Sequence, residues 1–351
     1  MKGIVLHGGH GTRLRPLTHT GPKQLLPIAN KPMSQYCIES LRHAGITDIA
    51  IVIGGLGSDK VRDFYGNGST FGIKITFIEQ DSPKGIAHAI NLCKDFIKNE
   101  KFVVFLGDNI MTKPINDVVE KFQNSSAEVS LLLCNVNNPT QFGIAEIDDE
   151  KIIKIVEKPK NPKSNLAVTG IYFFTPYIFT ILPKLKPSWR NEFEISDALQ
   201  LIINENKKID FDIITEFWKD TGTPDDILKA NSIILENFLD TDSNFSKIGE
   251  NISVGTETVI DKDSQIIGPV LIGKNCIIKS GTTIGPNVSI GNNCNISSCK
   301  ISNSIIMSNC TINSKIDIEK SIIAYNCKIL SKKASVDNDV FLLGEGTNII
   351  L

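Results

Sequence analysis

The residues with the clearest chemistry lie near the start of the chain, where glycines directly follow an apolar run. Gly3 to Leu6 is a candidate strand, and Gly8, Gly9 and Gly11 come after it. Glycines at the carboxyl end of a strand let backbone N–H groups approach a polyphosphate without interference from side chains. Arg13 then offers a planar guanidinium for the outer phosphates. This segment therefore predicts a loop that binds a polyphosphate.

Two common glycine-rich motifs do not fit this loop. A dinucleotide fingerprint would need glycine in place of Leu14, and a Walker loop would need Gly-Lys-Ser/Thr where Gly11-Thr12-Arg13 stands. A lysine follows instead, because Lys23 lies between Pro22 and Pro27, which restrict the chain. A lone lysine is usually a solvated surface charge. In combination with the glycines, Lys23 is a candidate for a second cation at the same phosphates.

Two aspartates stand where a metal ion could be held. Asp108 follows the candidate strand Phe102 to Leu106, and Asp220 precedes a helix whose start is marked by Thr223 and Pro224. Open α/β sheets bind ligands at the carboxyl ends of their strands. Carboxylates there can hold a hard cation that neutralises charge during phosphate chemistry. The alternative for either aspartate alone is a turn or cap residue.

Three further polar residues suit a base and a sugar. Gln80 ends a candidate strand, and an amide can both donate to and accept from the edge of a pyrimidine. Glu157 can bind paired sugar hydroxyls, while the ammonium of Lys158 can neutralise a sugar phosphate. The alternatives without a binding function are a turn-stabilising amide for Gln80 and an exposed ion pair for Glu157 and Lys158.

The combination of these motifs resembles a known family. The run Gly8 to Arg15, followed by Pro22-Lys23-Gln24, is the signature of sugar-phosphate nucleotidyltransferases. The stretch Ile28 to Pro32 looks like the long form of the glucose-1-phosphate thymidylyltransferases. The resemblance implies transfer of a nucleotidyl group from dTTP to glucose 1-phosphate, which gives dTDP-glucose and pyrophosphate. It also implies that Asp108 and Asp220 hold Mg²⁺.

The resemblance further implies a role for each matching residue. Arg13 and Lys23 would be catalytic. The nucleotide would contact Gly8, Gly9, Gly11, Thr12, Arg13, Gln80, Pro83, Gly85 and Asp108. The sugar phosphate would contact Gly143, Glu157, Lys158, Val168, Thr169, Gly170 and Arg190. The chain departs from the family at His7, where a small residue is usual, and at Asn191, where glycine is common.

The elements that position these residues change character along the chain. Up to about residue 238, short apolar runs alternate with helical periodicity, which predicts a mostly parallel Rossmann-like sheet with helices on both faces. The expected strands are Gly3 to Leu6, Ile49 to Ile53, Ile73 to Ile78 and Phe102 to Leu106. The expected helices include Ser34 to Ala44 and Ile86 to Lys98. We assign residues 1–238 to a catalytic domain and residues 239–247 to a linker.

Residues 248–351 follow a different rhythm, with an apolar residue at every sixth position. These positions are Ile248, Val254, Ile260, Ile266, Ile272, Ile278, Ile284, Ile290 and Ile296. A compact residue such as Cys276 or Cys294 stands four residues after most of them. This pattern is typical of the hexapeptide repeat of a left-handed parallel β-helix, in which successive coils stack their apolar edges. The spacing slips to five between Ile296, Ile301 and Ile306.

A β-helix of this kind is most often a stacking and oligomerisation module. The alternative is an acyltransferase, because the fold often hosts acyl-CoA chemistry in the groove between subunits. Such enzymes need a general base. No histidine occurs after residue 88, so an added acetyltransferase activity is disfavoured, although a bifunctional enzyme stays an alternative.

Composition narrows the partners. The formal net charge of −2 provides no basic face for a nucleic acid. No run of about 18 apolar residues occurs that would suit a membrane span. The eight cysteines form no CxxC pair, which favours reduced thiols. We therefore expect a soluble, cytoplasmic homo-oligomer that binds small molecules. The rivals are the same chemistry with UTP or another hexose 1-phosphate, and a regulatory or scaffold subunit without activity.

Overall fold

The computed structural model describes residues 1–9, 11–237, 245–330, 338–339 and 341–350. By its contacts the chain divides into two compact units. The first contains Met1–His10 and Ser34–Asp220, and the second contains Gly11–Met33 and Thr221–Leu351. Gly11–Met33 and the segment 221–237, which lie before the boundary expected at residue 238, group with the C-terminal part. Most of the expected linker, residues 239–244, lies outside the described residues.

The first unit is built on one mixed sheet with the strand order β10-β9-β11-β6-β1-β4-β5, and β8 pairs with both β11 and β12. The pairs that involve only β6, β1, β4 and β5 are parallel, whereas β11 runs antiparallel to β6. The strands are β1 (Lys2–Leu6), β4 (Asp48–Ile53), β5 (Lys74–Glu79), β6 (Phe102–Leu106), β8 (Val129–Asn135), β9 (Gly143–Asp148), β10 (Lys151–Glu157), β11 (Leu166–Phe174) and β12 (Ile209–Ile214). A separate two-stranded ribbon joins β7 (Asn109–Met111) to β13 (Trp218–Asp220).

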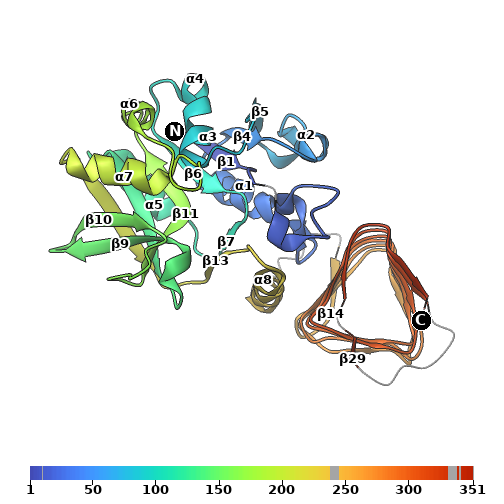
Figure 1. Cartoon of the computed structure of the whole chain (residues 1–351). Coiled ribbons are helices and arrows are strands. Elements are labelled where there is room, and N and C mark those ends of the chain that lie inside the picture. Colours follow the sequence, from blue (N-terminus) through green and yellow to red (C-terminus); the bar gives the residue numbers. More distant parts are fainter. Residues whose placement is uncertain (10, 238–244, 331–337, 340, 351) are drawn as a thin grey trace. The chain divides into compact units, whose positions relative to one another are not determined.

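Helices cover both faces of this sheet, as expected (Figure 1). On one face, the ring of Phe122 in α5 meets Phe173 of β11 edge-on. On the other face, Phe102 of β6 stacks on Phe179 of α6. The helices are α1 (Met33–His43), α2 (Ser58–Tyr65), α3 (Ile86–Leu92), α4 (Lys94–Ile97), α5 (Asn116–Asn124), α6 (Ile178–Ile181) and α7 (Ile195–Asn204). The Rossmann-like α/β class predicted from the sequence is confirmed.

One expected helix is divided. The pattern over residues 86–98 predicted a single helix, but α3 ends at Leu92 and α4 begins at Lys94. Cys93 lies between them with φ −86° and ψ 2°, outside the helical region. Its N–H bonds to the carbonyl of Ile90, three residues back, which tightens the last turn and redirects the chain. Periodicity alone did not reveal this break, because the apolar spacing continues through it.

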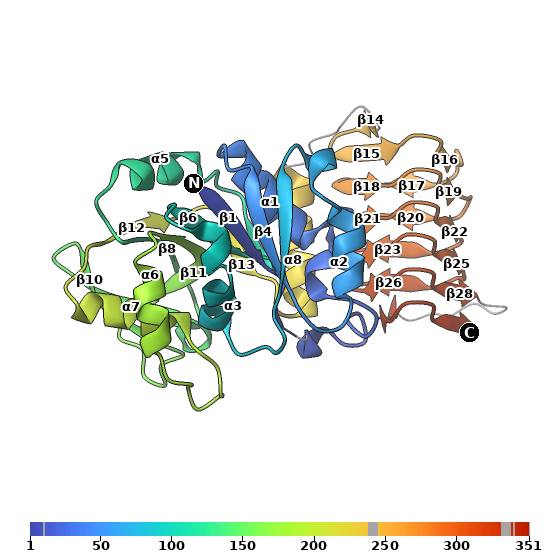
Figure 2. The same cartoon turned by 90° about the horizontal axis from the view of Figure 1, so that it is seen from above.

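The C-terminal part of the second unit is a parallel β-helix with three sheets, triangular in cross-section in Figure 1 and stacked in rows in Figure 2. The first sheet contains β14 (Phe245–Gly249), β15 (Ile252–Gly255), β18 (Val270–Ile272), β21 (Val288–Ile290), β24 (Ile305–Ile306), β27 (Ile322–Ile323) and β30 (Leu342–Leu343). The second contains β16 (Val259–Ile260), β19 (Ile277–Ile278), β22 (Asn295–Ser297), β25 (Thr311–Asn313), β28 (Lys328–Leu330) and β31 (Asn348–Ile350). The third contains β17 (Gln265–Ile266), β20 (Thr283–Ile284), β23 (Lys300–Ser302), β26 (Asp317–Glu319) and β29 (Asn338–Asp339).

The β-helix core consists of the residues that the six-residue spacing selected. Ile272 pairs with Ile290 in the next coil, and both are fully buried. Cys276 and Cys294 occupy the compact positions and are also buried, so they act as small apolar residues. The arrangement is consistent with the left-handed β-helix that the sequence predicted. Where the spacing slips to five, Ile306 still pairs with Ile290. The strands keep their register, so the coil is shortened in the turns between them.

The prediction that Ile248 is the first residue of the buried stack is wrong. Ile248 is 57% exposed, whereas the residues that follow it in the repeat are buried or partly buried. The reason is that Ile248 belongs to β14, which runs antiparallel to β15 and so does not form a coil of the helix. The regular core therefore begins at Val254.

The remainder of the second unit comprises a loop segment and one helix. The loop contains two short 3-10 helices (Thr12–Leu14 and Lys23–Leu25) and a hairpin of β2 (Pro27–Ile28) and β3 (Lys31–Pro32). The helix α8 (Pro224–Asn237) packs against β2 and β21. Its start carries the expected cap, because the Thr223 hydroxyl accepts from Asp226 N–H at 3.3 Å. Among the described residues, no helix has the length and apolar character needed to cross a membrane.

Candidate functional site

The two predicted metal-binding aspartates lie on adjacent segments of the first unit. Asp108 stands in the turn between β6 and β7. In the ribbon of β7 and β13, Asp220 is the direct partner of Asn109, which is the neighbour of Asp108. Residues separated by more than a hundred positions are thereby brought to neighbouring strands. Two carboxylates in this arrangement provide the oxygen ligands that a hard divalent cation prefers.

Asn109 holds the aspartate turn in place, and the sequence analysis did not select it. Its Nδ2 donates to Asp108 Oδ1 at 3.0 Å, and its Oδ1 accepts from Trp218 Nε1 at 2.8 Å and from Gly170 N at 3.2 Å. The side chain is 2% exposed. Asn109 therefore connects β7, β13 and β11 around Asp108. The one signal available in the sequence was its position directly after Asp108.

This contact also explains why a glycine stands at position 170. A Cβ added to Gly170 would lie 2.6 Å from Asn109 Oδ1, which is closer than real side chains approach. Thr169, beside it on β11, is fully buried. Val168 precedes both and pairs with Leu133 of β8. The three residues assigned to the sugar side thus lie in the middle of β11, next to the aspartate turn.

Gln80 lies directly after β5 and is 7% exposed. Its Nε2 donates to His88 Nδ1 at 2.9 Å and to the Gly85 carbonyl at 3.4 Å. A Cβ built on Gly8 would lie 3.5 Å from Gln80 Oε1, so the amide oxygen is next to the first loop glycine. Pro83 lies exposed in the connecting loop. The predicted base-binding residues Gln80, Gly85 and Gly8 are therefore neighbours.

Gly85 requires glycine for two reasons. Its φ is +100°, a backbone conformation that other residues rarely adopt, and an added Cβ would lie 2.5 Å from the Phe193 carbonyl oxygen. The Phe193 N–H in turn donates to the Lys84 carbonyl at 2.8 Å. A backbone hydrogen bond thus holds the loop before α7 against the segment that follows Gln80.

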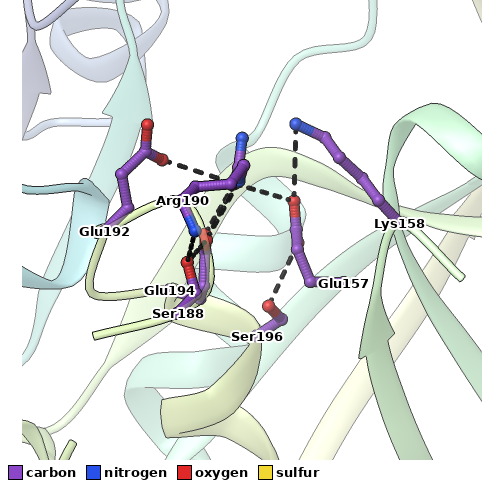
Figure 3. Close-up of polar contacts among 7 residues, drawn as sticks. All are labelled: Glu157, Lys158, Ser188, Arg190, Glu192, Glu194 and Ser196. Atoms are coloured by element: carbon purple, nitrogen blue, oxygen red, sulfur yellow. Dashed lines mark hydrogen bonds and ion pairs between the residues drawn. The ribbon is translucent and has the colours of Figure 1, made fainter. Parts of the chain in front are cut away.

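That loop, the end of β10 and the start of α7 together carry the ion-pair cluster of the sugar side (Figure 3). Glu157 ends β10 and pairs with Gly143 of β9, so two predicted sugar-binding residues are direct partners on adjacent strands. Glu157 Oε2 accepts from Ser196 Oγ at 3.0 Å, and Glu157 Oε1 lies 3.8 Å from Lys158 Nζ. Burial raises the pKa of the Glu157 carboxyl, which Lys158 opposes.

Arg190 lies among three carboxylates in this cluster. Its Nη2 is 2.8 Å from Glu194 Oε2, 3.3 Å from Glu192 Oε2 and 3.6 Å from Glu157 Oε1. The side chain of Glu194 is nearly buried and also accepts from Ser188 Oγ at 2.7 Å. A phosphate would have to compete with Glu194 for this guanidinium, whereas the exposed Lys158 ammonium has a single carboxylate nearby. Glu194 was not selected from the sequence.

The second unit holds the other half of the predicted phosphate loop. Gly11 has φ +57°, and a Cβ there would lie 2.9 Å from the Thr18 side chain and 3.4 Å from Lys23 Cβ. Lys23 therefore starts its short helix beside the loop glycine. The guanidinium of Arg13 lies against Gly222, because a Cβ at position 222 would be 3.0 Å from Arg13 Nη2. Within this unit, Gly11 thus lies beside Lys23, and Arg13 lies beside Gly222.

The loop glycines are divided between the units. Gly8 and Gly9 belong to the first unit, and Gly9 has φ +97°. Thr12 belongs to the second unit, where it begins a 3-10 helix. The convergence of Arg13 and Lys23 with Asp108 and Asp220 on one triphosphate therefore stays a prediction from the sequence.

His7, the departure from the family pattern, is a buried residue of the first unit. It is 2% exposed, and its ring meets Tyr65 edge-on with centroids 6.0 Å apart. Neither ring nitrogen hydrogen-bonds to any described residue. Burial lowers the pKa of His7 to about 3, although the charge of Asp108 opposes this shift. His7 is therefore neutral at neutral pH and packs against Tyr65.

Comparisons with known proteins show the family to which the chain belongs. The nucleotidyl transferase family model matches residues 2–237, and the GMPPB C-terminal domain model matches residues 266–350. The chain is 40% identical to the low-salt glycan biosynthesis nucleotidyltransferase Agl11 of Haloferax volcanii, over 100% of this chain and 98% of that protein. It is 38% identical to the glucose-1-phosphate thymidylyltransferase of Streptomyces antibioticus, over 99% of both chains.

A solved structure extends the likeness to three dimensions. A provisionally named glucose-1-phosphate thymidylyltransferase from Bacillus anthracis, in complex with sucrose, matches with a TM-score of 0.63 and 41% identity. The match covers 66% of this chain and 94% of that one. The family match, the shared fold and the full-length relatives lead to one conclusion: this chain belongs to the nucleotidyl transferase family and transfers nucleotidyl groups to sugar phosphates.

Proposed function

We propose that the protein transfers the nucleotidyl group of dTTP to glucose 1-phosphate and releases pyrophosphate. The pairing of β13 with β7 carries the proposal, because it places Asp220 opposite Asn109, the neighbour of Asp108. The thymidylyltransferase name of the Streptomyces antibioticus relative supports the choice of substrates. The name of the Haloferax relative, a glycan biosynthesis nucleotidyltransferase, leaves room for a related hexose 1-phosphate.

The proposed reaction is a single in-line displacement. An oxygen of the sugar phosphate attacks the α-phosphorus of dTTP, and the bond to the leaving pyrophosphate breaks. The attacking phosphate is already ionised, so no general base is needed. Arg13 and Lys23 would bind the outer phosphates and stabilise the departing pyrophosphate. Catalysis would then come from positioning and charge stabilisation.

Asp108 and Asp220 fit a magnesium ion by their chemistry and placement. Such an ion, when bound, would supply positive charge to the α-phosphate and the pyrophosphate. Asn109 would keep the Asp108 carboxylate in a fixed orientation through the 3.0 Å hydrogen bond to its Oδ1. The two carboxylates would thus hold the ion, and the ion would bind the reacting phosphates.

The base and the sugar would bind on either side of this turn. Gln80 would contact the pyrimidine edge, with Gly8 and Gly85 close to the ring. Thymine and uracil present the same edge and differ in the 5-methyl group, so UTP is the alternative donor. Glu157 would accept hydrogen bonds from sugar hydroxyls, and Lys158 would neutralise the sugar phosphate.

Two other activities have less support. An added acetyltransferase would need a general base, and the β-helix lacks histidine. An inactive scaffold subunit would show damage at Lys23, Asp108 or Asp220, and all three are present. For the β-helix we propose a homo-oligomerisation role in the cytoplasm. Val259 and Ile277, which pair across two coils, are 58% and 44% exposed and would be covered in such an assembly.

The test is pyrophosphate release, measured over dTTP, UTP, dCTP and GTP with glucose, galactose and mannose 1-phosphates. We expect the highest kcat/KM for dTTP with glucose 1-phosphate, and we expect turnover to be lost when Mg²⁺ is chelated. Acetyl-CoA is tested separately. Equal turnover with every nucleotide, or full turnover without a divalent cation, would contradict the proposal.

A matched pair of lysine variants tests the mechanism. Lys23→Ala should lower kcat by about 100-fold or more, because a charge-stabilising donor at the leaving group is lost. Lys154→Ala, at an exposed position on β10, is the control and should leave kcat unchanged. Circular dichroism checks that both variants fold. Near-normal turnover of the Lys23 variant would remove this residue from the mechanism.

A further inference from the structure

The hydrogen bonds of Gln80 restrict what its amide can offer to a base. The Gly85 carbonyl can only accept, so the amide atom beside it at 3.4 Å must be the nitrogen, Nε2. The same Nε2 lies 2.9 Å from His88 Nδ1. Because Nε2 is a donor, Nδ1 of His88 must carry a lone pair. The His88 imidazole is therefore neutral, and its proton is on its other ring nitrogen, His88 Nε2.

These two contacts use both N–H groups of the Gln80 amide. An amide nitrogen has two hydrogens, and the acceptors at Gly85 and His88 account for them. The atom that remains is Oε1, which lies beside Gly8. Gln80 in this setting presents an acceptor toward the loop, although an isolated amide could present either end.

The position of His88 suits this role. His88 lies in the first turn of α3, three residues after Gly85, and its ring is stacked against that of Phe193 with the centroids 6.5 Å apart. Burial and the charge of Lys84 lower the pKa of His88, which Asp81 opposes, so the neutral form persists at pH 7. The helix and the Phe193 loop together fix the ring, and the ring in turn fixes the amide.

We infer that His88 is a positioning residue for base selection. Because His88 Nδ1 accepts from Gln80 Nε2, the amide turns its oxygen, Gln80 Oε1, toward the nucleotide. An acceptor at this point pairs with the N3–H of thymine or uracil. Cytosine carries a lone pair at N3 and is repelled by the same oxygen. The inference rests on the proposed function, in which Gln80 contacts the base, and it adds a reason why a pyrimidine with N3–H is chosen.

The test compares binding of dTTP and dCTP, with Mg²⁺ and without sugar phosphate, by isothermal titration calorimetry. Wild type should bind dTTP more tightly than dCTP. His88→Leu removes the acceptor, so the amide can rotate, and the ratio of the two dissociation constants should narrow by about tenfold. His88→Asn, whose Oδ1 can accept in place of Nδ1, should restore most of the ratio.

Two controls separate this role from a structural one. Asn91→Leu changes an exposed residue of the same helix and should leave the ratio unchanged. Lowering the pH of wild type below the ordinary histidine range protonates His88 Nδ1, so the ratio should also narrow there. Cytosine N3 takes up a proton in acid as well, and His88→Asn measures that contribution, so the ratio should narrow more in wild type than in His88→Asn. This pH series gives the answer even where His88→Leu does not fold.

The outcomes are distinguishable from failure of the proposed function. Selective binding of dTTP without pyrophosphate release would overturn the proposed reaction and support the inference. Equal binding of dTTP and dCTP by wild type would overturn the inference. An unchanged ratio in folded His88→Leu, or equal narrowing at low pH in wild type and in His88→Asn, would overturn it as well.

Discussion

Replacement of Asn231 tests how the β-helix supports the loop that carries Lys23. Asn231 lies in the middle of α8 and is 1% exposed. Its Oδ1 accepts from Ala29 N at 2.9 Å and from Ser289 Oγ at 2.9 Å. Ala29 is in the β2–β3 turn, which follows Lys23, and Ser289 is in β21 of the β-helix. A single amide oxygen therefore joins the loop segment, the helix and the coil.

The turn needs this support because its backbone is unusual. Ala29 and Asn30 both have positive φ, of 46° and 61°, which is uncommon for residues other than glycine. Asn30 Nδ2 makes a second contact with the coil, to the Ile290 carbonyl at 2.6 Å. Such a turn persists only where its surroundings hold it.

The expected cost of Asn231→Leu follows from these contacts. The change leaves the Ala29 N–H and the Ser289 hydroxyl buried without an acceptor, at about 1–3 kcal/mol each. It also removes Asn231 Nδ2, which has no partner among the described residues, so part of the cost is offset. We expect a net loss of about 2–4 kcal/mol of unfolding free energy. We also expect a lower kcat, because Lys23 precedes the released turn.

Urea unfolding and steady-state kinetics measure these two effects. Asn237→Leu, at an exposed position of the same helix, is the matched control. A double-mutant cycle with Ser289→Ala should give a coupling energy of at least about 0.5 kcal/mol, since both residues share one hydrogen bond. An Asn231 variant as stable as the control, or additive energies in the cycle, would refute the reasoning.

Two further predictions concern the first unit. Asn109→Ala removes the acceptor of Gly170 N–H and Trp218 Nε1–H, so urea unfolding should show a loss of about 2–4 kcal/mol, and a change below about 0.5 kcal/mol would contradict it. His7 has a pKa of about 3 in the folded chain, below its ordinary value of 6.5, so the unfolded chain takes up the proton first. Wild type should therefore lose stability as the pH falls from about 6.5 toward 3, by up to about 1.4 kcal/mol per pH unit from this group. In metal-free buffer His7→Leu should lack this component of the slope, and equal slopes would show that His7 is not held neutral.

Local patterns predicted the fold well, because each repeats a physical constraint. Apolar runs marked β1, β4, β5 and β6 to within a residue or two, and the six-residue spacing identified the β-helix core. The errors fall where the apolar pattern continues but the regular backbone conformation ends or changes direction. Ile248 fits the spacing yet lies on an antiparallel strand, and the helix expected over 86–98 breaks at Cys93.

The candidate site was only partly accessible from the sequence. Asp108 and Asp220 could be selected because each follows or precedes a recognisable element. Asn109, Glu194, His88 and Asn231 could not, because their importance lies in contacts with residues far along the chain. An asparagine or a histidine in a loop or helix has no pattern of its own. Such residues are found only when their hydrogen-bond partners are known.

The most direct measurement of the central claim follows the α-phosphate of dTTP. The protein is incubated with Mg²⁺, glucose 1-phosphate and dTTP that is labelled at this phosphate. The account predicts that the label appears in dTDP-glucose, that unlabelled pyrophosphate forms in equal amount, and that neither forms without glucose 1-phosphate. Label that stays in dTTP, or that becomes attached to the protein, would contradict a single displacement by the sugar phosphate.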